Sequence, residues 1–164
     1  MSTSVHEGGC LCGAVRYRAN GKPMHTLVCH CTACQKMTGS SCYAESMFPL
    51  AAVEFTGTPM NCYAHVSDVS GKRVYMHFCP TCGTTVTLTF ERWPQYRAIS
   101  RGTFDDPNRV SVNAHIWLKS AQSGSALPSD MDCYYAARTT QDGHPEQRGR
   151  FATPQLATIL GAAG

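Results

Sequence analysis

Cys29-His30-Cys31-Thr32-Ala33-Cys34 places three thiols within six residues. Thiols spaced this closely can converge on one metal ion, and three of them leave the fourth position of a tetrahedral ion open. A substrate atom can take an open position, so that is where a bound metal can support chemistry. We therefore expect the chain to be organised around this stretch.

Two further pairs of cysteines flank the stretch, Cys10 with Cys12 before it and Cys79 with Cys82 after it. Four thiolates are what a closed tetrahedral zinc site requires, and such a site contributes mainly to folding. The run 79–83 is predicted to lie in a hairpin, because its proline and its final glycine favour a turn that directs backbone N–H groups at the sulfurs. This pattern is typical of a zinc knuckle.

Ligand counting leaves two questions open at the second site. His30 or Cys42 could fill the fourth position and make a second structural site, and the ten cysteines could divide between sites in another way. Three thiolates on Zn²⁺ leave a net charge of −1, which disfavours activation of water but still allows the fourth ligand to exchange for a thiolate. Sulfur chemistry is therefore favoured over hydrolysis.

The isolated cysteines and histidines are assigned no catalytic role. Cys42, Cys62 and Cys133 have no cysteine nearby in the sequence, and lone cysteines are most often small buried apolar side chains. His77 and His115 are expected to be packed or hydrogen-bonded side chains rather than bases.

Composition narrows the class of protein. A chain of 164 residues can bury enough surface to fold as one domain without disulfides. No apolar run is long enough for a membrane span and no signal peptide is evident, which predicts a cytoplasmic protein with no membrane partner. In that reducing compartment, closely spaced cysteines indicate metal rather than disulfides. The net charge of +3 comes from scattered residues, which argues against nucleic acid as a partner.

Short β-prone runs separated by turns predict a mainly β protein. A glycine pair, Gly8-Gly9, is read as a turn, and Cys10 and Cys12 are expected to share one face of the extended chain that follows. A short helix is predicted over 32–38, ending at Gly39. The expected strands cover 14–19, 26–28, 43–48, 53–55, 61–66, 73–78, 84–90, 97–100 and 110–118.

The C-terminal part is more polar than the rest of the chain. It is predicted to be a loosely attached tail, so that residues 1–137 form one zinc-binding domain and residues 138–164 follow it. Within the tail, Thr153 and Pro154 predict a short helix over 155–160.

The whole arrangement resembles the glutathione-dependent formaldehyde-activating enzyme family, which also includes the centromere protein V group. The resemblance covers roughly residues 8–135. The segments that carry it are Gly8-Gly9-Cys10-Leu11-Cys12-Gly13-Ala14-Val15-Arg16-Tyr17, Cys29-His30-Cys31-Thr32-Ala33-Cys34 with Gly39, Phe78-Cys79-Pro80-Thr81-Cys82-Gly83-Thr84, and His115-Ile116-Trp117.

The resemblance implies a mainly β, Mss4-like fold (a β-tent) of small antiparallel sheets with zinc sites. It implies two zinc ions per chain, a structural one on Cys10, Cys12, Cys79 and Cys82 and an open one on Cys29, Cys31 and Cys34.

The activity it implies is that of a carbon–sulfur lyase resembling S-(hydroxymethyl)glutathione synthase, which joins a small thiol, expected to be glutathione, to formaldehyde. The alternative is a non-catalytic, zinc-stabilised thiol carrier or protein-interaction module, and a homo-oligomer is compatible with either function.

Overall fold

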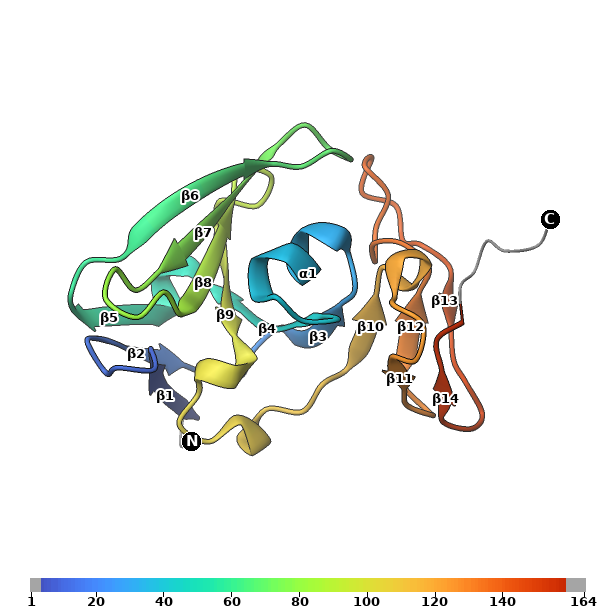
Figure 1. The fold of residues 1–164 in the computed structure, drawn as a ribbon, viewed down its shortest axis with the longest axis horizontal. Helices are drawn as coiled ribbons and strands as arrows, with labels where there is room; N and C mark the ends of the chain where they lie inside the picture. The colour runs from blue at the N-terminus through green and yellow to red at the C-terminus, as the bar shows by residue number, and fades with distance from the viewer. Residues whose placement is uncertain (1–3, 159–164) are drawn as a thin grey trace. The chain divides into compact units, whose positions relative to one another are not determined.

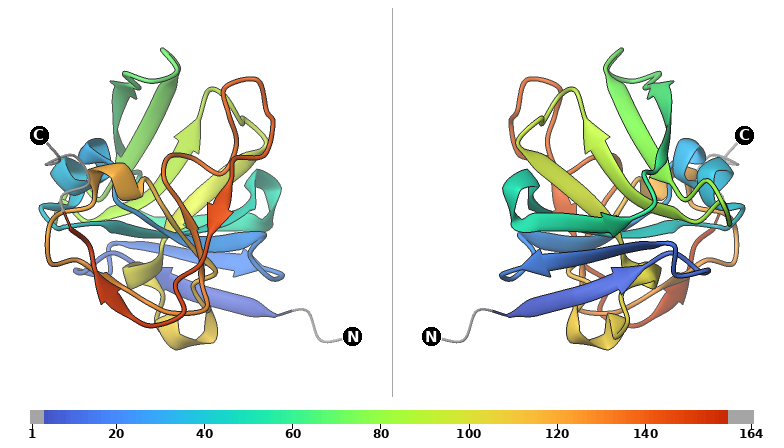
Figure 2. Two further views of the ribbon diagram at one scale, coloured as in Figure 1. Left: turned by 90° about the vertical axis from the view of Figure 1, so that its right-hand side faces the viewer. Right: turned by 90° about the vertical axis from the view of Figure 1, so that its left-hand side faces the viewer.

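The structure is a computed structural model that describes residues 4–158 (Figures 1 and 2). The chain forms two compact units that alternate along the sequence. Within the described residues, unit 1 comprises 4–26 and 45–111, and unit 2 comprises 27–44 and 112–158. Strands dominate both units, which confirms the predicted mainly β fold.

Unit 1 contains two sets of antiparallel strands. The first is a sheet in the order β1-β2-β5, made of β1 (Val5–Gly9), β2 (Val15–Asn20) and β5 (Val53–Gly57). The second runs in the order β4-β9-β8-β7-β6, so that β6 is its last strand. Its strands are β4 (Tyr43–Pro49, with 45–49 in unit 1), β6 (Asn61–Val66), β7 (Arg73–Phe78), β8 (Thr85–Phe90) and β9 (Tyr96–Ser100). Three 3₁₀ turns, η1 (Leu50–Ala52), η2 (Arg101–Thr103) and η3 (Pro107–Arg109), also belong to this unit.

The start of the chain differs from the prediction. The glycine pair Gly8-Gly9 ends strand β1 instead of forming a turn, and Gly8 lies opposite Tyr17 in the register with β2. A Cβ at Gly8 would collide with the carbonyl oxygen of Thr103 and the hydroxyl of Tyr17. Glycine is therefore present at this position because of close packing, which a local reading of the sequence cannot reveal.

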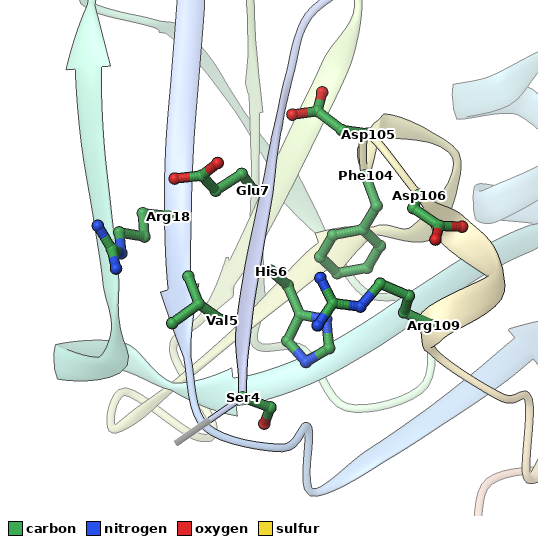
Figure 3. A pocket seen from close by; sticks show the side chains of 9 residues that line it. All are labelled: Ser4, Val5, His6, Glu7, Arg18, Phe104, Asp105, Asp106 and Arg109. Atoms are coloured by element: carbon green, nitrogen blue, oxygen red, sulfur yellow. The ribbon is translucent and has the colours of Figure 1, made fainter. Parts of the chain in front are cut away.

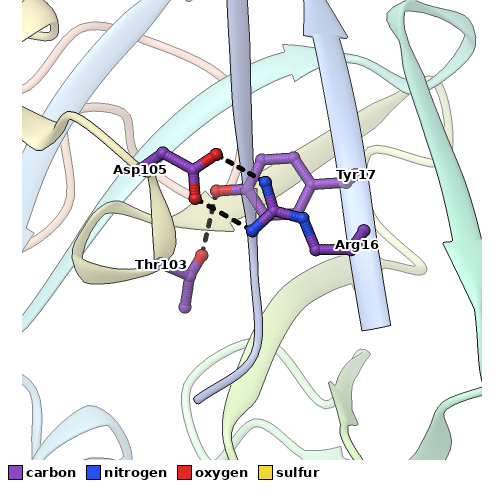
Figure 4. A network of polar contacts seen from close by, with 4 residues as sticks. All are labelled: Arg16, Tyr17, Thr103 and Asp105. Atoms are coloured by element: carbon purple, nitrogen blue, oxygen red, sulfur yellow. Dashed lines mark hydrogen bonds and ion pairs between the residues drawn. The ribbon is translucent and has the colours of Figure 1, made fainter. Parts of the chain in front are cut away.

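The core of unit 1 holds β1 and β2 against the segment around η2. Phe48 and Ile99 are fully buried, and the rings of Tyr17 and Phe104 meet edge to face with centroids 5.8 Å apart. The Tyr17 hydroxyl lies 3.0 Å from Thr103 Oγ1. Beside it, the two terminal guanidinium nitrogens of Arg16 donate to the carboxylate of Asp105, one of them over 2.9 Å (Figure 4). These contacts fix the loop after β9 to the first hairpin.

Unit 2 carries the helix and a set of short strands. Strand β10 runs parallel both to β3 and to β12, and β12 pairs antiparallel with β13. The strands are β3 (His25–Cys29, with 27–29 in unit 2), β10 (Ala114–Ile116), β12 (Asp132–Tyr134) and β13 (Arg148–Gly149), with β11 (Ala126–Leu127) and β14 (Gln155–Leu156) forming a separate antiparallel pair. The 3₁₀ turn η4 (Leu118–Ser120) follows β10.

Helix α1 (Thr32–Thr38) has the bounds that the sequence predicts. Gly39 follows it with φ 61°, a left-handed conformation that glycine adopts at no steric cost, and donates its N–H to the carbonyl of Gln35. The strand predicted over 110–118 is confirmed only at 114–116, because Trp117 takes a left-handed conformation with φ 62° and ends it.

Residues after 137 contribute strands to unit 2. β13 pairs with β12, and β14 pairs with β11. The helix predicted over 155–160 is wrong over 155–158, because Gln155 and Leu156 are extended and residues 157–158 are irregular, and residues 159–160 lie outside the described residues. So short a helix has little stability of its own, and pairing with β11 satisfies the backbone instead. Within 4–158, no helix has the length and apolar character needed to cross a membrane.

Candidate metal centres

A tight turn between β1 and β2 brings Cys10 and Cys12 together. The Gly13 N–H donates to the carbonyl of Cys10 over 3.0 Å, and the two sulfurs lie 3.5 Å apart. The expectation that they share a face of extended backbone is therefore wrong, because the chain turns at 11–12 before β2 begins. The two sulfurs still converge, because the turn is compact.

The hairpin between β7 and β8 supplies the other pair, as predicted. The N–H of Gly83 donates to the Cys79 carbonyl over 2.9 Å, and Gly83 has φ 73°. The sulfurs of Cys10, Cys12, Cys79 and Cys82 all lie within 4.8 Å of one another. Cys12 Sγ is 3.8 Å from Cys79 Sγ. Sulfurs around a tetrahedral zinc ion, with bonds of about 2.3 Å, are separated by about 3.8 Å. The donor set and its dimensions therefore fit zinc.

Backbone and hydroxyl groups surround this first cysteine group. The Val15 N–H donates to Cys10 Sγ over 3.3 Å, and Thr84 Oγ1 lies 3.2 Å from Cys82 Sγ. Thr84 also accepts a hydrogen bond from the Leu11 N–H, so it links the two turns. Hydrogen bonding to Thr84, by its side chain and its backbone, lowers the pKa of Cys82 to about 5. These contacts favour the thiolate form at Cys82, whereas the neighbouring thiol of Cys10 raises the pKa of Cys12 to about 12.

The second cysteine group is built where β3 meets helix α1. Cys29 is the last residue of β3, Cys31 caps the N-terminus of α1, and Cys34 lies in the helix's first turn. The Cys34 N–H donates to Cys31 Sγ over 3.3 Å, so the helix end directs a donor at a sulfur. All three sulfurs lie within 4.8 Å of one another. Cys29 is buried, and the other two are half-buried.

The three thiols of this group influence one another strongly. Hydrogen bonds with the thiols of Cys29 and Cys34 lower the pKa of Cys31 to about 3. The hydrogen bonds of Cys34 with Cys29 and Cys31 raise the pKa of Cys34. The neighbouring thiols thus favour ionisation of Cys31 and disfavour ionisation of Cys34. A bound cation would favour the thiolate form of all three cysteines. The cluster is suited to a divalent metal that prefers sulfur.

Neither proposed fourth ligand joins this group among the described residues 4–158. His30 and Cys42 are not among the ligand atoms that converge on the three sulfurs. His30 is instead buried with its ring stacked on His115, and His30 Nε2 lies 3.0 Å from His115 Nδ1. His77 lies 2.9 Å from Thr89 Oγ1 through its Nε2. The prediction that His77 and His115 are hydrogen-bonded side chains is therefore confirmed.

Gln35 ties the second cysteine group to the segment after β10. Its Nε2 donates to the carbonyls of His30 and Ser120, over 2.7 and 2.8 Å, and its Oε1 accepts from Gln122 over 3.0 Å. The sequence-based predictions do not include Gln35. The available signal was its position, one residue after Cys34 and in the same helix, but two of its partners, Ser120 and Gln122, lie 85 and 87 residues away in the chain.

Trp117 lies next to the strand pair that carries Cys29. Ile116 is the register partner of Cys29, and the His30 N–H donates to the Ile116 carbonyl over 3.0 Å. The left-handed conformation of Trp117 is costly for a large side chain. The Trp117 N–H donates to the Ala136 carbonyl over 2.8 Å, which helps to hold it. Lys119 lies over the indole ring at 4.7 Å.

A separate pocket in unit 1 contains no cysteine in its lining. Its volume is about 490 Å³, and Figure 3 shows the Arg109 guanidinium beside the rings of His6 and Phe104. Burial, followed by the positive charge of Arg109, lowers the pKa of His6. The lining carries charges of both signs, and it shares no residue with either cysteine group.

Comparison with known proteins points to one family. Residues 5–120 match the family described as "Glutathione-dependent formaldehyde-activating enzyme". A protein of Halomonas elongata, provisionally named a glutathione-dependent formaldehyde-activating enzyme, is 28% identical over 92 residues, or 54% of this chain. The match spans 59% of that relative's length. A crystal structure of a Rhodobacter sphaeroides protein aligns with a TM-score of 0.49 and 16% identity, over 63% of this chain and 93% of that one.

Proposed function

Because this chain belongs to the glutathione-dependent formaldehyde-activating enzyme family, we propose that it is a zinc-dependent carbon–sulfur lyase resembling S-(hydroxymethyl)glutathione synthase. Its substrates would be a small thiol, with glutathione the first candidate, and formaldehyde. The observation that carries the proposal is the second cysteine group, where three sulfurs converge without a fourth ligand from the described chain.

In this proposal the two cysteine groups have different roles. Zinc on Cys10, Cys12, Cys79 and Cys82 would join the β1–β2 turn to the β7–β8 hairpin and serve the fold. Zinc on the second group would supply a fourth ligand position that a substrate thiol can take as thiolate. Two zinc ions per chain are therefore expected.

The chain's own residues would shape the second site. Cys31 and Cys34 are held by the first turn of α1, and Gln35 anchors that turn to the carbonyls of His30 and Ser120. The contact between His30 and His115 would fix the backbone between Cys29 and Cys31. A site held at several points keeps its geometry when a ligand arrives, which is how an enzyme converts binding into orientation.

The proposed reaction is balanced without a redox partner. The thiol loses its proton, and its sulfur forms a bond to the formaldehyde carbon as the carbonyl π bond breaks. The carbonyl oxygen takes up one proton. Thiol and aldehyde therefore combine into an S-hydroxymethyl product, a hemithioacetal, with no net release of protons. Orientation and a lowered thiol pKa are the contributions expected of the site.

The experiment that tests this proposal is exchange NMR on an equilibrium mixture of glutathione and ¹³C-formaldehyde. We expect the zinc-loaded protein to accelerate interconversion with S-(hydroxymethyl)glutathione, and Cys31→Ser to return it to the uncatalysed rate. Cys62→Ser is the matched control, because Cys62 is an exposed cysteine outside both groups.

Two results would count against the enzyme. Equal acceleration by Cys31→Ser protein would place the chemistry elsewhere. Thiol binding by the wild type with no acceleration would identify a thiol carrier, the non-catalytic alternative.

A further inference from the structure

Strand β6 is exposed along almost its whole length. It is the last strand of its set, and in the part of the chain that the structure describes only β7 pairs with it. Five of its six residues are exposed, and His65 is half-buried. Tyr63 and Val66 expose 59% and 53% of their surface, and Val69 in the following turn exposes 50%. Figure 1 shows β6 on the outer side of its hairpin with β7.

The sequence of β6 lacks the devices that usually protect a sheet edge. Asn61-Cys62-Tyr63-Ala64-His65-Val66 contains no proline, lysine, arginine, aspartate or glutamate. Natural edge strands commonly carry such residues, or a bulge, to prevent pairing with another chain. The register with β7 is regular from Asn61 to Val66, and the register shift between His77 and Phe78 belongs to the pairing of β7 with β8. β6 is therefore a regular edge strand that is open to pairing.

Alternate residues of an edge strand direct their N–H and C=O groups away from the sheet. In a monomer these backbone groups form hydrogen bonds with water. A second strand can replace that water. Tyr63 and Val66 would lose exposed apolar surface at the same time. Backbone pairing and the burial of apolar surface thus both favour the association of β6 with another strand.

We propose that β6 pairs antiparallel with β6 of a second copy of this chain, making a two-fold dimer with a continuous sheet. The strand offers no charge for an acidic or basic peptide to recognise, whereas two identical uncharged strands meet without repulsion. Every copy of the chain also carries the same unpaired edge, as a two-fold interface requires.

The two-fold register can be chosen from side-chain size. Opposite residues of an antiparallel pair lie on the same face of the sheet, so a two-fold axis normal to the sheet must pass beside a residue and not between two residues. With the axis at Ala64, each Ala64 lies opposite the partner's Ala64, and each Tyr63 lies opposite the partner's His65. The smallest side chain of the strand then meets its own copy at the axis, which avoids crowding there. Because a six-residue strand buries less than a standard interface, we expect a dissociation constant of roughly micromolar size.

Sedimentation velocity over a range of protein concentrations tests this interface, with the zinc-loaded full chain. We expect the wild type to shift from monomer to dimer as concentration rises, and Tyr63→Lys/Val66→Lys to remain monomeric over that range. Leu156→Lys is the matched control, because Leu156 is a similarly exposed apolar residue, at 63%, on strand β14 of unit 2. It should dimerise like the wild type.

Hydrogen exchange gives a second readout on the same proteins. Amides of β6 should exchange more slowly in concentrated than in dilute wild type, and at the fast rate in Tyr63→Lys/Val66→Lys at both concentrations. A wild type that stays monomeric, or a dimer that survives the double substitution in folded protein, would overturn the proposal. Neither result would bear on the thiol chemistry of the second cysteine group.

Discussion

At the scale of single residues, Gly8 shows how close packing can demand a glycine. Replacing Gly8 by Ala should lower the free energy of unfolding by about 1–3 kcal/mol, because the new methyl group would collide with the Thr103 carbonyl and the Tyr17 hydroxyl. Gly102→Ala is the control, since a Cβ there meets nothing within 4 Å. Chemical denaturation of proteins with equal zinc content measures the free energy of unfolding of both variants. Equal losses in the two variants would contradict this account of Gly8.

Residue identity alone predicted the cysteine groups but not their surroundings. Cysteine spacing is local information, so the sulfurs of both groups could be chosen from the sequence. The partners of His30 and Gln35 are His115 and Ser120, each 85 residues away, and no local pattern indicates them. Such contacts depend on the parallel pairing of β3 with β10, which only the folded chain reveals.

A second prediction at this scale concerns the pKa of Asp105. The guanidinium of Arg16 hydrogen-bonds to this carboxylate and lowers its pKa below the ordinary value. A lowered carboxyl pKa means that the ion pair stabilises the fold above the unfolded pKa of about 4 and is lost as pH falls through the folded pKa. Both side chains are about half exposed, so the contribution should be at most about 1 kcal/mol.

Carboxyl NMR titration checks this prediction directly. In Arg16→Gln the Asp105 midpoint should rise towards the ordinary value, and the stability difference from wild type should shrink below about pH 4. Asp132 provides an internal control, since its pKa is lowered by Arg150 in unit 2 and should not move. An unchanged Asp105 midpoint would show that the ion pair does not persist in solution.

At the scale of elements, the β7–β8 hairpin is the best predicted part of the chain. A proline and a left-handed glycine specify its turn locally, and its two cysteines follow from that geometry. Strand β1 was missed because Gly8-Gly9 is typical of a turn, and β10 was predicted too long because nothing in the sequence shows that Trp117 adopts positive φ. The sequence therefore predicted the turn that depends on local residues, but not the strands whose bounds depend on tertiary packing.

The hairpin also carries a prediction about stability. Cys82→Ser should prevent folding, because structural zinc contributes about 10 kcal/mol or more in small zinc peptides and a whole domain has only about 5–15 kcal/mol. Circular dichroism and metal analysis should show unfolded protein that has lost zinc, with Cys62→Ser folded as the control. Folded Cys82→Ser protein with two zinc ions would refute a structural role for this group.

At the scale of the whole molecule, the described structure consists of two units that alternate along the sequence, and each contains one cysteine group. The mainly β class followed from the many short runs, but the division into units depends on pairings between distant segments such as β3 and β10. The predicted boundary between residues 1–137 and 138–164 stays a prediction, although β13 and β14 lie beyond it.

Because the two cysteine groups lie in separate units, we expect a substitution in one group to leave metal binding by the other group intact. Cys31→Ser should keep its circular dichroism spectrum and one zinc ion per chain, because the first group would remain intact in unit 1. Metal analysis of purified protein measures the count. A Cys31→Ser protein as unfolded as Cys82→Ser would remove the distinction between a structural and an open site.

The proposed chemistry requires the second cysteine group to leave one metal position for a thiol, and the visible spectrum of cobalt-substituted protein reports on that position. Glutathione should intensify and shift the visible bands of protein loaded with cobalt at both groups, because a fourth thiolate joins three, and S-methylglutathione should leave them unchanged. Cys31→Ser protein should give no response to either compound. Visible bands of the wild type that stay unchanged with saturating glutathione would contradict the open site, and with it the proposed thiol chemistry.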